Sequence, residues 1–265
     1  MEKYKNIVKE YNEKYSKYLH ELRLPGDTLK DEIIYGILLN LGTRNDRLLE
    51  VGCGVGHTSN KLSKLTEVVG VDLSEKAIEI ASKSSRAYFV RADIQILPFR
   101  DNSFKYAVAK DVLEHVLDDD SALRELNRVC KDNGILIIYV PHVLHPVNFS
   151  AESLVKKLVG YTIDPSASHL RRYSLFEVVK KLERNQFSTL AVWYFSHFAL
   201  SLITLVGVIS YDLFLRKRKN ITRTGLFLIK LMFNIFEKLG MFEEKVFKNL
   251  PGAGLFGIAK NKKSK

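Results

Sequence analysis

Residues 48–56 read Leu-Leu-Glu-Val-Gly-Cys-Gly-Val-Gly, an apolar run that ends in three glycines spaced two residues apart. The apolar part predicts a buried strand, and the pattern that follows predicts a helix beginning at once, near His57. Glycine suits such a turn because the chain bends sharply there and because a ligand can approach a backbone without Cβ atoms. The N-terminus of the next helix offers unpaired N–H groups and a partial positive charge. The stretch therefore predicts a ligand-binding strand, turn and helix.

Short apolar runs alternate with helical patterns on both sides of this stretch. Strands of a parallel sheet are covered on both faces and are joined by crossover helices, so the alternation predicts a three-layer α/β fold. Asn133-Gly134 predicts the end of a helix that begins near Asp118. Ser174 and Glu177 match a capping box that starts another helix. The predicted strands are 47–51, 68–72, 88–91, 106–110, 135–140, 189–196 and 255–260.

The two ends of the chain differ from this core. The first 45 residues read as helical, with a break at Pro25-Gly26 before a second helix that Asp27 opens. Between Arg216 and Lys265 the chain carries 13 Lys and Arg against three Asp and Glu, although the remainder is nearly neutral. The units predicted are an N-terminal helical cap over 1–45, a cofactor-binding core over 46–196, an apolar and basic helical insertion over 197–253, and a last strand with a basic tail over 254–265.

Cysteine content and the charged first residues bear on the compartment. The chain has two cysteines and opens on a charged stretch where a signal sequence would be apolar. We therefore expect a reducing, cytoplasmic location. The basic C-terminal fifth favours an anionic partner, and its apolar stretches favour peripheral contact with a membrane interface. A helical lid or a dimer contact is the alternative for residues 197–253, and the oligomeric state is left open. No acceptor-base motif supports nucleic acid as the partner.

Acidic residues near the glycines distinguish between possible ligands. A dinucleotide fingerprint reads G-x-G-x-x-G, whereas Gly56 comes one residue early for that pattern. Glu50 lies two residues before the first glycine, where a carboxylate suits the sulfonium and amino group of S-adenosylmethionine (SAM). Asp72, at the end of the next predicted strand, can accept hydrogen bonds from both ribose hydroxyls. Asp93, at the end of the third, is expected near the adenine amine.

Together with further motifs downstream, these residues resemble the class I SAM-dependent methyltransferases, in particular the type 11 and ubiquinone-biosynthesis-like members. The motifs are Glu50-Val-Gly-Cys-Gly-Val-Gly56, Val71-Asp72-Leu-Ser74, Ala92-Asp93, Leu97-Pro-Phe99, Ser103-Phe104 and Asp111-Val-Leu-Glu-His-Val116. The resemblance covers residues 47–142 in order and continues in the run His169-Leu-Arg-Arg-Tyr173. It implies a Rossmann-like sheet of order 3-2-1-4-5-7-6 with an antiparallel last strand. It also implies SAM contacts from Glu50, Gly52, Gly54, Gly56, Asp72, Leu73, Asp93, Ile94, Lys110 and Asp111.

Residues able to reach the transferred methyl are expected after the fourth and fifth strands. The donor sulfonium is already activated, so alignment supplies much of the catalysis, and a base is needed only where the acceptor must first lose a proton. The acceptor predicted is a lipid-like small molecule methylated on O, N or C. The alternatives are a soluble small molecule, or a SAM-binding regulator without catalysis. Predicted catalytic residues are His115, His142 and His145, and predicted substrate contacts are Tyr15, His169, Arg171 and Tyr173.

The run Asp111-x-x-Glu114-His115 raises the question of a metal. It is similar to the Glu-x-x-Glu-His run of the O-methyltransferases of ubiquinone biosynthesis, where those side chains hold a divalent cation. The aspartate here has a shorter reach, and Leu-Glu-His-Val occurs across the wider family without a metal. We therefore expect no metal and an activity that survives a chelator. The alternative is a cation held by Asp111, Glu114 and His115.

Overall fold

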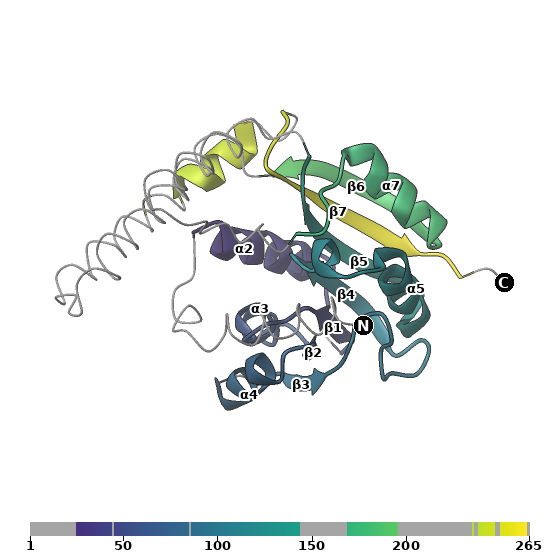
Figure 1. Ribbon diagram of the computed structural model, residues 1–265. Coiled ribbons are helices and arrows are strands. Elements are labelled where there is room, and N and C mark those ends of the chain that lie inside the picture. The colour runs from purple at the N-terminus through teal and green to yellow at the C-terminus, as the bar shows by residue number, and fades with distance from the viewer. Residues whose placement is uncertain are drawn as a thin grey trace.

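The computed structural model describes residues 25–43, 45–84, 86–143, 169–195, 235, 238–246 and 250–263. Strands within them form one sheet in the order β3-β2-β1-β4-β5-β7-β6 (Figure 1). The first five strands pair in parallel, whereas β7 runs antiparallel to both β5 and β6. The predicted sheet order and the antiparallel last strand are therefore confirmed. The strands are β1 (Arg47–Val51), β2 (Glu67–Asp72), β3 (Tyr88–Arg91), β4 (Phe104–Lys110), β5 (Cys130–Pro141), β6 (Phe187–Phe195) and β7 (Gly254–Asn261).

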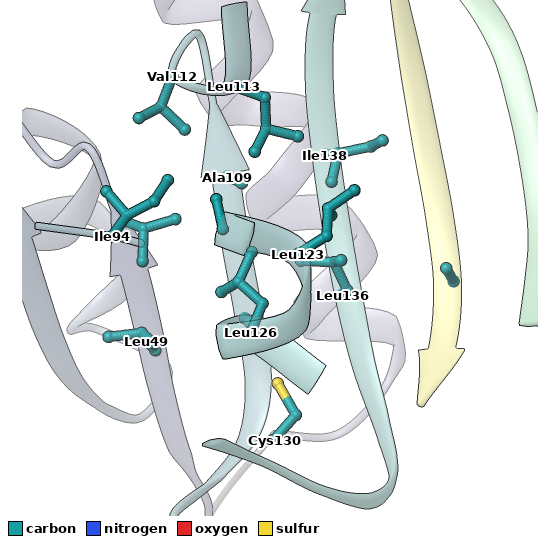
Figure 2. Packing of buried hydrophobic residues seen from close by; sticks show 14 of the residues in the cluster. Leu49, Ile94, Ala109, Val112, Leu113, Leu123, Leu126, Cys130, Leu136 and Ile138 are labelled. Carbon is teal, nitrogen blue, oxygen red and sulfur yellow. The ribbon is translucent and has the colours of Figure 1, made fainter. Parts of the chain in front are cut away.

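Helices cover both faces of the sheet, as the three-layer prediction requires (Figure 1). One face packs against α2 and α3 through buried side chains that include Ile34, Leu38 and Leu62. The other packs against α5 and α7, and Figure 2 shows Leu123 and Leu126 of α5 lying over β4 and β5. Full burial of each such side chain stabilises the fold by about 1.5–3 kcal/mol. The helices are α2 (Pro25–Asn40), α3 (His57–Leu62), α4 (Glu75–Ser84), the 3₁₀ turn η2 (Leu113–His115), α5 (Asp119–Val129) and α7 (Leu175–Arg184).

The junction between α5 and β5 corrects the sequence analysis. The helix ends at Val129, and Cys130 is already extended, so the helix end predicted at Asn133-Gly134 was wrong. Those residues lie instead in an irregular part of β5. There Phe104 of β4 pairs with Cys130, and Tyr106, two residues on, pairs with Ile135. Asn133 takes a left-handed φ of 57°, and a Cβ on Gly134 would lie 2.8 Å from the Lys131 carbonyl oxygen. The Asn-Gly pair thus accommodates a strand irregularity and does not cap a helix.

The capping box before α7 is confirmed. The Glu177 N–H donates to Ser174 Oγ at 3.2 Å, and the Ser174 N–H donates to Glu177 Oε2 at 2.7 Å. In the part of the chain that the structure describes, no helix is both long and apolar enough to cross a membrane. The described part of the predicted insertion comprises residue 235, a helical stretch at 238–246 and residues 250–253. The unit boundaries at 45, 196 and 253 remain predictions.

Candidate functional site

The turn after β1 requires glycine at two positions. Gly52 has φ 71°, and a Cβ there would lie 2.6 Å from Val112 Cγ2, in the loop after β4. Gly56 has φ 81° and caps α3, and a Cβ there would lie 2.8 Å from the ring of Phe89. Both the conformation and the close packing therefore exclude larger residues. The turn consequently holds the β4 loop and the N-terminus of α3 against one another.

Asp72 fixes this turn from the end of β2. It is 5% exposed, and its Oδ2 accepts the Gly54 N–H at 2.9 Å while its Oδ1 accepts the Ser74 N–H at 2.8 Å. Asp72 was predicted to bind the ribose, and this bond across the turn was not predicted. Each carboxylate oxygen has a second lone pair, so the bonds to the backbone leave acceptor capacity for ribose hydroxyls. Leu73, the next residue, lies at the same strand end.

The third predicted carboxylate, Asp93, follows β3. Its Oδ1 accepts the Gln95 N–H at 2.9 Å, and Ile94 beside it is 4% exposed. The segment that continues from here is held by Arg128 of α5, whose guanidinium donates to the carbonyl oxygens of Leu97 at 2.9 Å and Phe99 at 2.8 Å. The predicted adenine region is therefore anchored to α5.

Glu50 is a buried acid at the end of β1. It is 2% exposed, and Ser59 Oγ of α3 donates to its Oε2. Burial raises the pKa of Glu50 to about 7, although the charge of Lys110 and the Ser59 hydroxyl both act to lower it. A cationic ligand at this position would favour the ionised carboxylate. This agrees with the predicted place of the methionine end of SAM.

Two ion pairs join α2 to the end of β4, and sequence analysis did not anticipate them. Lys110 Nζ lies 2.7 Å from Asp31 Oδ1, and Lys30 Nζ lies 2.7 Å from Asp111 Oδ2. Asp31 is completely buried, and it shares one helix face with the apolar Ile34. An acid on the apolar stripe of a helix was the available signal, because such a charge is buried only when it is paired. The pairs place the predicted cofactor residues Lys110 and Asp111 under the cap helix.

Three residues at the predicted acceptor side lie together. Glu114 Oε1 is 3.7 Å from His169 Nε2 and 3.9 Å from His115 Nε2, and the two imidazole rings meet edge to face with centroids 4.7 Å apart. We call these residues the Glu114 cluster. Each offers one possible metal-ligand atom, all within 4.8 Å of one another. Asp111 pairs with Lys30, and the alternative ligand set of Asp111, Glu114 and His115 stays a prediction.

The other predicted acceptor residues are engaged elsewhere in the fold. His142 is 2% exposed, its Nδ1 lies 3.1 Å from the Gly252 carbonyl oxygen, and burial lowers its pKa. Tyr173 Oη donates to Asp119 Oδ2 at 2.8 Å, and Arg171 donates to the Leu117 carbonyl oxygen at 2.8 Å. These contacts give Tyr173 and Arg171 a structural role, and their contact with substrate remains a prediction. Tyr15 and His145 lie outside the described residues.

Comparisons with known proteins agree with this geometry. A family model described as "Methyltransferase domain" matches residues 49–138, which include the glycine turn, the acids at the ends of β1 to β3 and the Glu114–His115 pair. A demethylmenaquinone methyltransferase of Staphylococcus aureus is 34% identical over 110 residues, which are 38% of this chain and 46% of that protein. The chain thus spans about half the length of the curated relatives that it matches.

Solved structures extend the similarity of fold over most of the chain. A SAM-dependent methyltransferase from Thermotoga maritima superposes with a TM-score of 0.59 at 16% identity, over 97% of this chain and 99% of that one. Phosphoethanolamine N-methyltransferase 2 of Haemonchus contortus, in complex with SAM, gives a TM-score of 0.55 at 18% identity, over 87% of this chain and 53% of that one. Residues 49–138 therefore match the methyltransferase-domain family model, and the chain has the fold of the SAM-dependent methyltransferases.

Proposed function

We propose that this protein transfers the methyl group of SAM to a lipophilic hydroxyaromatic acceptor of the quinol type. The observation that carries the proposal is the 34% identity to a demethylmenaquinone methyltransferase over 110 residues. A quinol is a flat apolar ring with acidic hydroxyl groups. It would meet basic side chains at this site. The imidazoles of His115 and His169 are both partly accessible to solvent, with 10% and 15% of their side chains exposed.

Different residues of this chain would bind SAM and the acceptor. Glu50 would neutralise the cationic end of SAM, while Asp72 and Asp93 would hold ribose and adenine. Such fixed contacts align the methyl group with the acceptor, which is the main catalytic requirement when the leaving group is already activated. The acceptor would lie beyond the end of β4, next to His115.

We further propose that the helical insertion rests on an anionic membrane, from which a lipophilic acceptor can be taken. Leu239, Phe242 and Val246 recur at helical spacing in the helix at 238–246, and each is about half exposed or more. The 10 surplus positive charges between Arg216 and Lys265 fit an anionic surface. The alternatives are a lid over the active site and a contact between two copies of the chain.

An acceptor panel tests the proposed reaction. The full chain is incubated with methyl-labelled SAM and one of three acceptors: a demethylated naphthoquinol with a prenyl tail, the same ring without the tail, and phosphoethanolamine as a soluble amine. Label on the prenylated quinol above all others supports the proposal. Preference for the tail-less ring indicates the soluble alternative, and label on phosphoethanolamine alone contradicts a quinol acceptor. A chain that binds SAM and labels none of the three favours a regulatory SAM-binding protein.

A further inference from the structure

The turn that carries Glu114 and His115 lies directly against the cofactor loop. η2 follows β4 after two residues, and Val112 fills the space where Gly52 has no side chain. Asp111, at the start of this loop, takes a left-handed φ of 52°, a conformation that costs energy for a residue with a Cβ and is held here by the Lys30 ammonium. The position of His115 relative to the glycine turn is therefore set by packing and by an ion pair.

Glu114 is a buried carboxylate without a hydrogen-bond donor among the described residues. It is 0% exposed, and neither Oε1 nor Oε2 has a hydrogen-bonding partner. The Nε2 atoms of His169 and His115 lie 3.7 Å and 3.9 Å from Oε1, and both distances exceed hydrogen-bond length. An unpaired buried carboxylate is costly as an anion. The cluster therefore gains stability when it takes up a proton, either on the carboxyl group or on an adjacent imidazole.

Other charged and ionisable groups influence proton binding by the Glu114 cluster. Burial raises the pKa of Glu114 to about 8, with Asp111 adding to the rise and Lys30 opposing it. The Glu114 charge also acts on Tyr139 of β5 and Tyr173 before α7, and burial keeps both phenols neutral by raising their pKa. A proton held by this cluster can thus be gained and lost near neutral pH, which is what a proton acceptor in catalysis requires.

His142 does not share these properties. Its ring lies against Tyr194, its Nδ1 is engaged by the Gly252 carbonyl oxygen, and no carboxylate is paired with it among the described residues. A second ionisable partner is what distinguishes His115 from His142, because an imidazolium next to a carboxylate is stabilised and an imidazolium in apolar surroundings is not.

We propose that His115 is the general base that takes the hydroxyl proton of the acceptor, with Glu114 and His169 as positioning residues that stabilise the resulting imidazolium. This inference rests on the proposed function, since it requires an acceptor that carries a hydroxyl group. Glu114 and His169, which come from two separate parts of the chain, thereby receive a role in catalysis.

The step balances as follows for a quinol. The acceptor O–H bond breaks, an imidazole nitrogen gains the proton, and the electron pair stays on the acceptor. That pair, on the oxygen or delocalised to a ring carbon, forms the bond to the methyl carbon as the bond between sulfur and methyl breaks. When a ring carbon is methylated, its displaced proton leaves afterwards and the oxygen regains one. In either case one proton is released to water in each turnover.

Kinetics of the full chain with the tail-bearing quinol test the assignment. We expect His115→Asn to lower kcat by roughly 10²- to 10⁴-fold, the usual contribution of a positioned base, with SAM affinity unchanged. Glu114→Gln removes the carboxylate that would stabilise an imidazolium at His115, so the acidic limb of the pH–rate profile should move to lower pH. A purely structural role for Glu114 would lower kcat without moving that limb. Glu183→Gln, an exposed carboxylate on α7, is the matched control and should leave the profile unchanged.

Two results would contradict the assignment of His115 as the general base. One is a His115→Asn variant that binds SAM and turns over like wild type. The other is loss of wild-type turnover with EDTA that a divalent cation restores, since the cluster would then act through a metal. Should His115→Asn fail to bind SAM, the Glu114→Gln pH profile carries the test alone.

Proton NMR of the imidazoles separates this inference from the proposed function. In wild type the His115 and His169 resonances should titrate together, with curves that change in Glu114→Gln and not in Glu183→Gln. If wild type methylates no hydroxylated acceptor while the two histidines titrate together, the proposed acceptor is wrong and the coupled cluster stands. Independent single titrations, unaffected by Glu114→Gln, would overturn the cluster whether or not quinols are methylated.

Discussion

Glu50 shows how burial alone can prepare a residue to receive a cation. Its pKa near 7 lies above its ordinary value of 4.5, so the folded chain without cofactor binds a proton that the unfolded chain releases between those values. The contribution of Glu50 to stability is therefore present at low pH and is lost as pH rises towards 7. A bound sulfonium and ammonium would favour the ionised form and offset that loss.

From this we predict that SAM affinity increases with pH and levels off above about pH 7. The physical reason is that the cation must displace the proton from Glu50 below that pH. Titration calorimetry between pH 5.5 and 8.5 measures the affinity, and proton uptake or release is read from buffers of different ionisation heat. Glu50→Gln should bind more weakly and show a flatter profile. An equally steep profile in that variant would assign the titration to another group.

A second prediction for a single residue concerns Asp72. We expect Asp72→Ala to weaken SAM binding by roughly 1.5–3 kcal/mol, because a charge-assisted partner of the ribose is lost. The loss of the bond to the Gly54 N–H adds to this by loosening the turn. Calorimetry with SAM measures the effect, and Asp132→Ala, an exposed acid far along the chain, serves as the control. Unchanged affinity in Asp72→Ala would mean that the ribose lies elsewhere.

At the scale of the element, α2 is attached to the sheet by charge as well as by apolar packing. Removing Asp31 would leave the Lys110 ammonium buried without its partner. We therefore expect Asp31→Ala to lower the free energy of unfolding by about 3–5 kcal/mol. Asp27→Ala, on the same helix but 43% exposed, should cost far less.

Urea unfolding followed by circular dichroism measures both variants. The double variant Asp31→Leu, Lys110→Met tests the cause, since replacing both charges by apolar side chains should recover most of the lost stability. A double variant as unstable as Asp31→Ala would show that packing, and not the unpaired charge, explains the loss.

Elements could be predicted from this sequence wherever local pattern and tertiary packing agree. The buried strands before Gly52 and Asp72 read as apolar runs, and Ser174 with Glu177 defined the start of α7 through contacts three residues apart. The helix end predicted at Asn133-Gly134 was wrong because the same dipeptide suits both a helix end and a strand irregularity. Only the pairing of this segment with β4 distinguishes the two.

The site could be predicted less completely than the fold. Glu50, Asp72 and Asp93 were found because each lies at or just past the end of a strand, and parallel strands bring such positions to one edge of the sheet. Asp31 was missed, since its partner Lys110 is 79 residues away and no local pattern links them. His169 was placed near substrate, but its pairing with Glu114 also depends on long-range contact.

At the scale of the whole molecule, the basic and apolar C-terminal fifth sets the proposed location. We predict that the chain sediments with anionic liposomes and is released by salt, because each basic residue near such a surface contributes about 1 kcal/mol. Replacing Arg216, Lys217, Arg218 and Lys219 with Gln should abolish most of the binding while SAM affinity is retained. Wild-type chain that stays in the supernatant at low salt would favour the lid or the dimer contact. The matched control neutralises four exposed cations of the core: Lys64, Lys83, Lys180 and Arg184.

The position of β7 between β5 and β6 has a consequence for biosynthesis. β7 is the last of the seven strands to leave the ribosome, yet both β5 and β6 pair with it and not with each other. Until residues 254–261 emerge, β5 and β6 each present an open row of backbone donors and acceptors, which invites pairing with other nascent chains. A stop codon before Gly254 would make that state permanent, so such a product should be a substrate for chaperones and proteases even though its cofactor residues are all present.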